Sequence, residues 1–304
     1  MSPVTETSDN PQRYLDPLTL AKVRSLELQA QLVVEGYLAG MHKSPYHGFS
    51  VEFAQHREYV PGDDLRHLDW KVWGRTGRYF LKQYEEETNL ICWLLVDVSE
   101  SMQYGSGPIS KYDYASIIAA SLAYLTLRQQ DSAGLVTFDD QLRHFLRPSS
   151  QPSHLKEVIR LLNLGGGREK TSLGDLFHEL AERITRRAIL VILSDLFDDP
   201  ATILAGLKHL RHKRHDVILF HVMDPAELEF PFQQATLFRG LEQFPDLLTD
   251  PRTLRQGYLE QVQGFIQQMR HGCRNQNIDY VQLRTDANLS VALSSYLAQR
   301  LSRK

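Results

Sequence analysis

The sequence predicts an α/β fold in which a doubly wound, mostly parallel central sheet carries helices on both faces. From residue 91 onward, short runs of aliphatic and β-branched residues alternate with longer stretches of helical apolar spacing. This order is typical of parallel strands that are joined by crossover helices. The chain has 304 residues, 42% of them hydrophobic, which is enough to bury a large core.

Five apolar runs have the length of buried strands. We expect strands at residues 91–96, 133–138, 188–193, 217–222 and 280–283. Residues 141–146 follow Asp139 and Asp140 and alternate weakly between polar and apolar, which predicts an antiparallel hairpin at the edge of the sheet. The sheet is therefore expected to be mixed.

The stretches between these strands have the apolar spacing of amphipathic helices. We expect helices at residues 112–128, 154–162, 173–184, 202–212, 252–275 and 289–301. Residues 225–251 contain several prolines and phenylalanines without a sustained period, so they predict a long packed loop.

The N-terminal part has a different character. Residues 1–13 are polar and predict a disordered tail, and residues 18–38 predict one helix. Residues 48–85 are rich in charges, aromatics and glycines, which indicates β structure. We therefore divide the chain into the tail, an N-terminal helix with a β-rich appendage over 14–88, and the α/β domain over 89–304.

Composition argues against several classes of protein. The net charge is −3 and both signs are mixed along the chain, so no basic patch for nucleic acid or an anionic membrane is evident. The N-terminus lacks the basic and apolar regions of a signal peptide, and the longest apolar runs are far shorter than the roughly 20 residues of a membrane span. Cys92 and Cys273 fall in apolar or helical stretches, which indicates buried thiols in a reducing compartment, although two cysteines can pair. We expect a cytoplasmic protein.

Oxygen-bearing side chains follow two of the predicted strands. Asp97, Ser99 and Ser101 stand at alternate positions after one strand, and Asp195 follows another. Thr171 lies at the start of a predicted helix. Open α/β sheets bind ligands at the carboxyl edge of the strands, and hard cations such as Mg²⁺, Mn²⁺ or Ca²⁺ prefer oxygen ligands. The five residues therefore predict a divalent-metal site.

Each of these residues also has an ordinary structural interpretation. Serines and threonines cap helices, and aspartates at strand ends form turns. The serine after Thr171, with Asp175, has the spacing of a capping box. The metal interpretation depends on three separate segments reaching one edge of the sheet.

The order Asp-x-Ser-x-Ser, loop Thr, strand-end Asp is similar to the metal-ion-dependent adhesion site (MIDAS) of von Willebrand factor A domains. The resemblance assigns metal-ligand roles to Asp97, Ser99, Ser101, Thr171 and Asp195. It also implies that an acidic residue of a partner protein completes the metal coordination. The sequence departs from the pattern after Asp195, where Leu196 and Phe197 stand in place of glycine.

A second resemblance extends over most of the chain. Residues 57–70, Arg75 and residues 84–87 resemble the signature of the domain-of-unknown-function fifty-eight (DUF58) family, and Asp224 to Glu227 and Thr285-Asp286 also fit it. This bacterial and archaeal family commonly accompanies MoxR-type AAA+ ATPases. The resemblance implies a protein–protein interaction module that assists the assembly or maturation of other proteins.

Three alternatives remain beside this interpretation. Asp97 could be the nucleophile of a metal-dependent phosphoester hydrolase, but Ser99 occupies the place of the second acid. Residues 165–171 end in Lys-Thr after a glycine run, yet their spacing departs from a phosphate-binding loop. The charged segment from Arg57 to Asp69 suits an ion-pair network with Trp70 and Trp73 beneath it, or else a docking surface for the ATPase. We expect binding and no catalysis.

Overall fold

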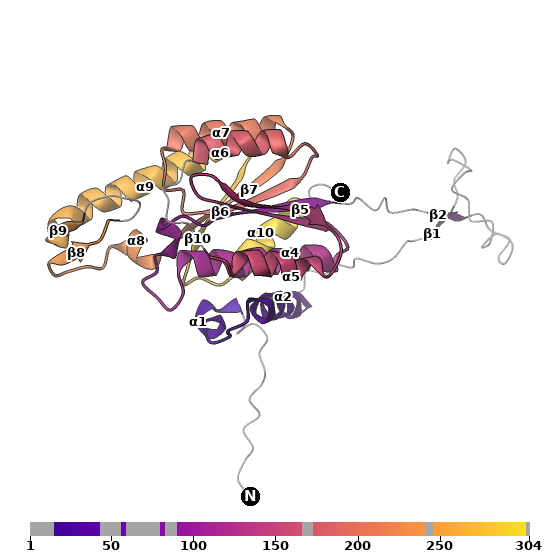
Figure 1. Cartoon of the computed structure of the whole chain (residues 1–304), viewed down its shortest axis with the longest axis horizontal. Coiled ribbons are helices and arrows are strands. Elements are labelled where there is room, and N and C mark those ends of the chain that lie inside the picture. Colours follow the sequence, from indigo (N-terminus) through magenta and orange to yellow (C-terminus); the bar gives the residue numbers. More distant parts are fainter. Residues whose placement is uncertain are drawn as a thin grey trace, which may run out of the picture. The chain divides into compact units, whose positions relative to one another are not determined.

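The fold is built around a six-stranded sheet (Figure 1). The computed structural model describes residues 15–42, 56–58, 80–82, 90–165, 173–240 and 246–301. The strands lie in the order β10-β7-β6-β3-β4-β5, and every neighbouring pair is parallel except β4 and β5. Their bounds are β3 Ile91–Asp97, β4 Ser132–Phe138, β5 Leu142–Ser149, β6 Ile189–Ser194, β7 Asp216–Met223 and β10 Asp279–Arg284. The predicted mixed α/β sheet with its antiparallel edge strand is confirmed.

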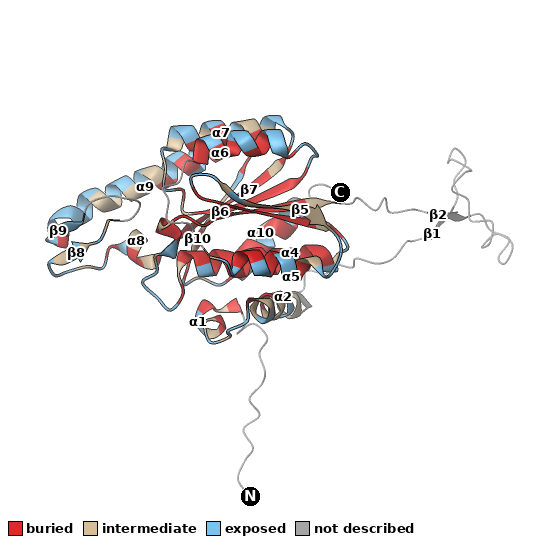
Figure 2. Ribbon diagram, viewed as in Figure 1, coloured by how far each residue is buried: buried red, intermediate tan, exposed pale blue. Residues whose placement is uncertain are grey.

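Helices cover both faces of the sheet (Figure 1). One face carries α4 (Lys111–Arg128), α5 (His154–Leu162) and α10 (Ser290–Leu301). The other carries α6 (Leu173–Arg183), α7 (Pro200–His212) and α9 (Pro251–Asn275). The buried side chains form two clusters that the sheet separates, and the helices turn their exposed sides outward (Figure 2). Parallel strands that are buried on both faces explain why the sequence showed continuous apolar runs.

The N-terminal helix differs from the prediction of one unbroken helix. Two helices are present, α1 (Pro17–Leu20) and α2 (Leu26–His42), and the chain between them is not helical. Buried side chains of both helices, including Leu20 and Val34, belong to the core cluster on the α4 side. This segment therefore packs as part of the α/β unit, although the sequence grouped it with the appendage.

Two compact units are distinguished by their contacts. One comprises residues 1–41 and 90–304, and the other comprises residues 42–89. Within the second unit, β1 (His56–Glu58) pairs antiparallel with β2 (Phe80–Lys82). Most of the charged segment from Arg57 to Asp69, with Trp70 and Trp73, lies outside the described residues, so its interpretation stays a prediction.

The segment after β7 is more structured than the predicted loop. It contains α8 (Pro225–Glu229) and an antiparallel pair of short strands, β8 (Thr236–Phe238) and β9 (Leu247–Thr249). Each element is shorter than the window over which a period can be recognised. Capping by Asp224, which accepts a hydrogen bond from the amide of Ala226 at 2.8 Å, fixes the start of α8.

Two further predictions concern the thiols and membrane spans. Cys92 and Cys273 are both buried, as expected. Across the described ranges, no helix has the length and apolar character required to cross a membrane.

Candidate metal centre

The loop after β3 brings its side chains to the carboxyl edge of the sheet. Asp97 is the last residue of β3 and is completely buried. Its carboxylate accepts hydrogen bonds from the amide of Ser99 at 2.9 Å and from the hydroxyl of Ser194 at 2.6 Å. The hydroxyls of Ser99 and Ser101 lie 3.1 Å apart, and Ser101 begins a short 3₁₀ helix, η3 (Ser101–Gln103). The Asp-x-Ser-x-Ser segment thus turns all three side chains toward one place.

The carboxylate of Asp97 is held by neutral donors alone. No basic side chain of the described residues lies within ion-pair distance of it. Burial, followed by the negative charge of Asp195, raises the pKa of Asp97 to about 7. A buried carboxylate without a counter-ion is costly, and a cation would remove that cost.

Asp195 approaches the same place directly after the end of β6, and its side chain is 6% exposed. Its Oδ2 lies 2.7 Å from the ammonium of Lys111, a side chain that is only 2% exposed. Burial by itself would raise the pKa of Asp195, but the adjacent ammonium outweighs it and the pKa is lowered, with a further contribution from a hydrogen bond of Ser101. Asp195 is therefore ionised and already partly neutralised.

Lys111 also binds the first turn of α8. Its ammonium lies 2.6 Å from Oε1 of Glu227, while Oε2 of Glu227 accepts a hydrogen bond from the amide of Asp224 at 2.8 Å. One ammonium therefore serves two carboxylates, so Lys111, Asp195 and Glu227 together carry one net negative charge. An ionised Asp97 brings the sum over these four groups to two negative charges, which one divalent ion would match.

His221 supports Asp195 from the neighbouring strand β7. Its Nε2 lies 3.0 Å from the backbone oxygen of Asp195, and its Nδ1 lies 2.6 Å from the hydroxyl of Tyr280. Burial lowers the pKa of His221 to about 4, so the ring is neutral at physiological pH. It contributes hydrogen bonds and no charge to this edge.

Four of the five predicted metal ligands meet in this way. Asp97, Ser99, Ser101 and Asp195 share one edge of the sheet, whereas Thr171 lies outside the described residues, as do residues 166–170 of the glycine run. Within the part of the chain that the structure describes, no three His, Cys, Asp or Glu side chains form a metal-binding group. Two carboxylates and two hydroxyls are nevertheless a donor set that suits a hard cation.

Comparison with known proteins identifies the family. The model of the family described as "Protein of unknown function DUF58" matches residues 55–264. The chain belongs to the DUF58 family. The uncharacterized proteins Rv1480 of Mycobacterium tuberculosis and Mb1516 of Mycobacterium bovis are each 29% identical over 219 residues, which cover 71% of this chain and 68% of the relative.

Several solved structures are similar to this DUF58 chain at low sequence identity. BatB from Bacteroides thetaiotaomicron is 16% identical with a TM-score of 0.47, covering 71% of this chain and all of that protein. An aerotolerance-related membrane protein from Bacteroides fragilis is 16% identical with a TM-score of 0.46, covering 69% and 98%. The SpRpn10 VWA domain is 13% identical with a TM-score of 0.40, covering 68% and 94%.

Residues that the sequence analysis assigned to DUF58 by resemblance meet at the same edge. Asp224 accepts hydrogen bonds from the amide and hydroxyl of Ser106, at 2.9 and 2.5 Å. The hydroxyl of Thr285 donates to Asp224 at 3.3 Å, and the amide of Thr285 donates to the carbonyl of Met223 at 3.0 Å. These two motifs therefore join the loop after β3 to the ends of β7 and β10.

Sequence reasoning missed Lys111, Ser194 and His221 at this DUF58 edge. Lys111 is the first residue of α4, after the capping residue Ser110, and a lysine there is normally a solvated surface residue. Ser194 and His221 lie inside or at the end of buried strands. A polar side chain in an otherwise apolar strand was the available signal for both.

Proposed function

We propose that this DUF58 protein is a protein-interaction module that binds its partner through a divalent metal ion, Mg²⁺ or alternatively Mn²⁺ or Ca²⁺. The observation that supports the proposal is the buried carboxylate of Asp97, which is surrounded by hydroxyls and has no basic partner among the described residues. Asp97, Ser99, Ser101 and Asp195 would hold the ion, and Thr171 is the predicted fifth ligand. The bound ion would offer an open coordination position to an acidic residue of the partner.

The charge balance of this edge supports binding of an acidic group. Lys111 is shared by Asp195 and Glu227, so these three groups and an ionised Asp97 carry two net negative charges, which a divalent ion would match. A carboxylate from another protein could then approach as a charge-assisted ligand. We further propose that a MoxR-type AAA+ ATPase is the partner or remodels the complex, and that the protein works in the cytoplasm. That part rests on the family resemblance alone.

The same geometry favours a non-catalytic role for Asp97. Attack by Asp97 on a phosphoester also needs a second acid nearby for proton transfer, and the place two residues on is held by Ser99, whose hydroxyl lies 3.1 Å from that of Ser101. We therefore propose that the protein is not an enzyme. Turnover of a generic phosphoester that is lost in Asp97→Asn would contradict this proposal.

Two measurements test the metal-dependent function. Calorimetry with Mg²⁺ should give binding heat for the native protein and none for the double variant Asp97→Ala with Ser99→Ala. Asp140→Ala is a matched control, because Asp140 is an exposed carboxylate in the turn after β4 and should leave the heat unchanged. Equal heats for the native protein and the double variant would reject the metal site.

The second measurement is pull-down of a MoxR-type AAA+ ATPase and of lysate proteins, with Mg²⁺ and with chelator. Capture should require the ion and should be weakened by Asp195→Ala and Thr171→Ala. Capture that is indifferent to chelator and to both variants would remove the metal from the mechanism.

A further inference from the structure

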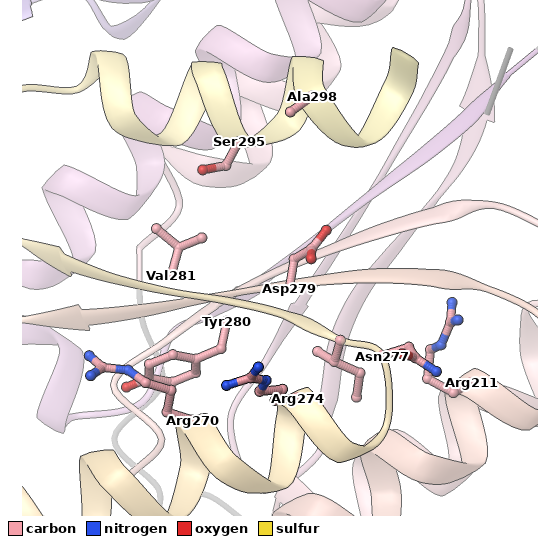
Figure 3. Close-up of a pocket in the computed structure, with 10 residues that line it drawn as sticks. Arg211, Arg270, Arg274, Asn277, Asp279, Tyr280, Val281, Ser295 and Ala298 are labelled. Atoms are coloured by element: carbon pink, nitrogen blue, oxygen red, sulfur yellow. The ribbon is translucent and has the colours of Figure 1, made fainter. Parts of the chain in front are cut away.

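A second surface lies at the opposite end of the sheet from Asp97. A groove of about 770 Å³ begins at the amino end of β10, between α9 and α10 (Figure 3). Its lining residues come from α7, α9, α10 and β10 itself. Those that carry the argument are Arg270, Arg274, Asp279, Val281, Ser295 and Ala298.

The floor of the groove is an open strand edge. Among the described residues, β10 pairs with β7 and with no other strand. In a parallel pair, alternate backbone groups face each side of a strand, so half of the N–H and C=O groups of β10 face away from β7. The strand has exposed and half-buried residues along most of its length, including Asp279, Tyr280 and Val281. Unpaired edge groups of this kind are a template for an added strand.

Two arginines line the α9 side of this edge. Arg270 and Arg274 are exposed and stand one helical turn apart, and neither has a carboxylate within ion-pair distance among the described residues. Arg270 lies over the ring of Tyr280, with its guanidinium 5.9 Å from the ring centroid. Arg211, by contrast, is already paired with Asp216 at 2.9 Å. Arg270 donates only to the neutral amide oxygen of Gln282, at 3.4 Å. The acid within the groove is Asp279, so Arg270 and Arg274 leave an excess of positive charge.

The α10 side of the groove is lined by small side chains, which leave room for a bound segment. Ser295 and Ala298 of α10 face it with small side chains, and Val281 adds an apolar contact (Figure 3). A strand laid along β10 would therefore place alternate side chains toward the arginines and toward this small-residue wall. One helical turn is about 5.4 Å, and two strand residues span about 6.6 Å, so acids two positions apart would reach both arginines.

We propose that this groove binds an extended acidic segment of another protein, which adds to β10 as a seventh strand. The backbone edge supplies hydrogen bonds, and Arg270 and Arg274 select acidic residues at alternate positions. This surface is separate from the candidate metal centre, so its binding should not depend on divalent ions.

The test uses the full chain and a displayed library of random peptides longer than β10. Panning in the presence of chelator should enrich peptides with two acidic residues at alternate positions and without proline between them. The double variant Arg270→Glu with Arg274→Glu should weaken the enriched peptides by at least about tenfold. Arg252→Glu, on the same helix but outside the groove, should leave their affinity unchanged, and circular dichroism should be the same for all three proteins.

Two readouts separate strand addition from a simple charge effect. A bound peptide should slow amide hydrogen exchange in residues 279–284, and methylation of its backbone nitrogens should abolish binding. Failure to enrich acidic peptides, or equal binding to the double variant, would overturn the proposal. Equal binding of the methylated peptide, or competition by inorganic phosphate alone, would identify a small-anion site and would also overturn it.

Discussion

Asp97 is a buried carboxylate whose environment opposes its ionisation. Burial and the neighbouring charge of Asp195 raise its pKa to about 7. The folded protein without metal therefore binds a proton at Asp97 more tightly than the unfolded chain does. The stabilising effect of that proton is complete below the ordinary aspartate pKa of about 4 and is lost as the pH rises through about 7.

The first prediction concerns this proton. In chelator, the melting temperature of the native protein relative to Asp97→Asn should fall between about pH 4 and pH 7, because the native carboxylate ionises without a counter-ion. Thermal melts of both proteins across this range measure the difference. A constant difference would contradict the raised pKa, and saturating Mg²⁺ should reverse the trend.

The second prediction concerns Lys111. Lys111→Met leaves Asp195 and Glu227 without their shared cation, and breaking a buried ion pair from one side typically costs about 3–5 kcal/mol. Denaturant unfolding should show a loss of this order. Adding Glu227→Gln should recover part of it, since one of the two uncompensated charges is then removed. If Lys111→Met were as unstable as the double variant with Glu227→Gln, the charge of Glu227 would not contribute to the loss of stability.

Only some residues of the candidate metal site could be predicted from the sequence. Asp97 and Asp195 could be found because they follow continuous apolar runs, which place them at strand ends. Lys111 could not, because one of its two carboxylate partners, Glu227, lies on α8, an element of five residues that the sequence did not reveal. Thr171 lies outside the described residues, so its role stays a prediction.

Among the elements, α6 and α7 pack closely against each other through glycine. A Cβ on Gly206 of α7 would lie 2.8 Å from Cβ of Phe177 and 2.9 Å from the carbonyl oxygen of Gly174, both on α6. Such distances require the helices to separate. The two glycines therefore set the spacing of this helix pair.

The third prediction follows from that contact. Gly206→Ala should destabilise the protein by about 1–3 kcal/mol through overpacking, despite the better helix propensity of alanine. Gly257→Ala is the matched control, because a Cβ there meets nothing within 4 Å and the substitution should stabilise α9 by about 0.5–1 kcal/mol. Denaturant unfolding of both variants measures the contrast, and destabilisation of the same size in both would point to a cause other than packing.

Long elements were predictable and short ones were not. The strands β3 to β7 and β10 had continuous apolar runs or, for β5, a weak alternation. The helices α4, α5, α6, α7, α9 and α10 had a sustained helical period. The break between α1 and α2 and the short elements α8, β8 and β9 are determined by capping and by tertiary contacts, which leave no period in the sequence.

The sheet lies between the two hydrophobic clusters of the α/β unit. Asp97 and Asp195 end strands that lie side by side at its centre, with α4 and α6 on opposite faces. An ion that joins these two strand ends would therefore bind the folded sheet and not the unfolded chain. Binding of this kind stabilises the whole unit.

The fourth prediction is that Mg²⁺ raises the melting temperature of the native protein. A concentration of about 100 times the dissociation constant corresponds to about 2.7 kcal/mol. Differential scanning calorimetry over a Mg²⁺ series should show this rise in the native protein and none in Asp97→Ala with Ser99→Ala. A rise that is equal in both proteins would place the stabilising ion elsewhere.

The ion pair of Lys111 with Asp195 means that the protein itself supplies a cation to this edge of the sheet. One of the two carboxylates that we propose as metal ligands already lies 2.7 Å from a tethered ammonium, which dilution cannot remove. Sodium or potassium would offer Asp195 nothing that the ammonium does not already supply. A divalent ion would gain by bridging Asp195 to Asp97, which the ammonium leaves unmatched. Selection between monovalent and divalent ions would then follow from a lysine that is not itself a metal ligand.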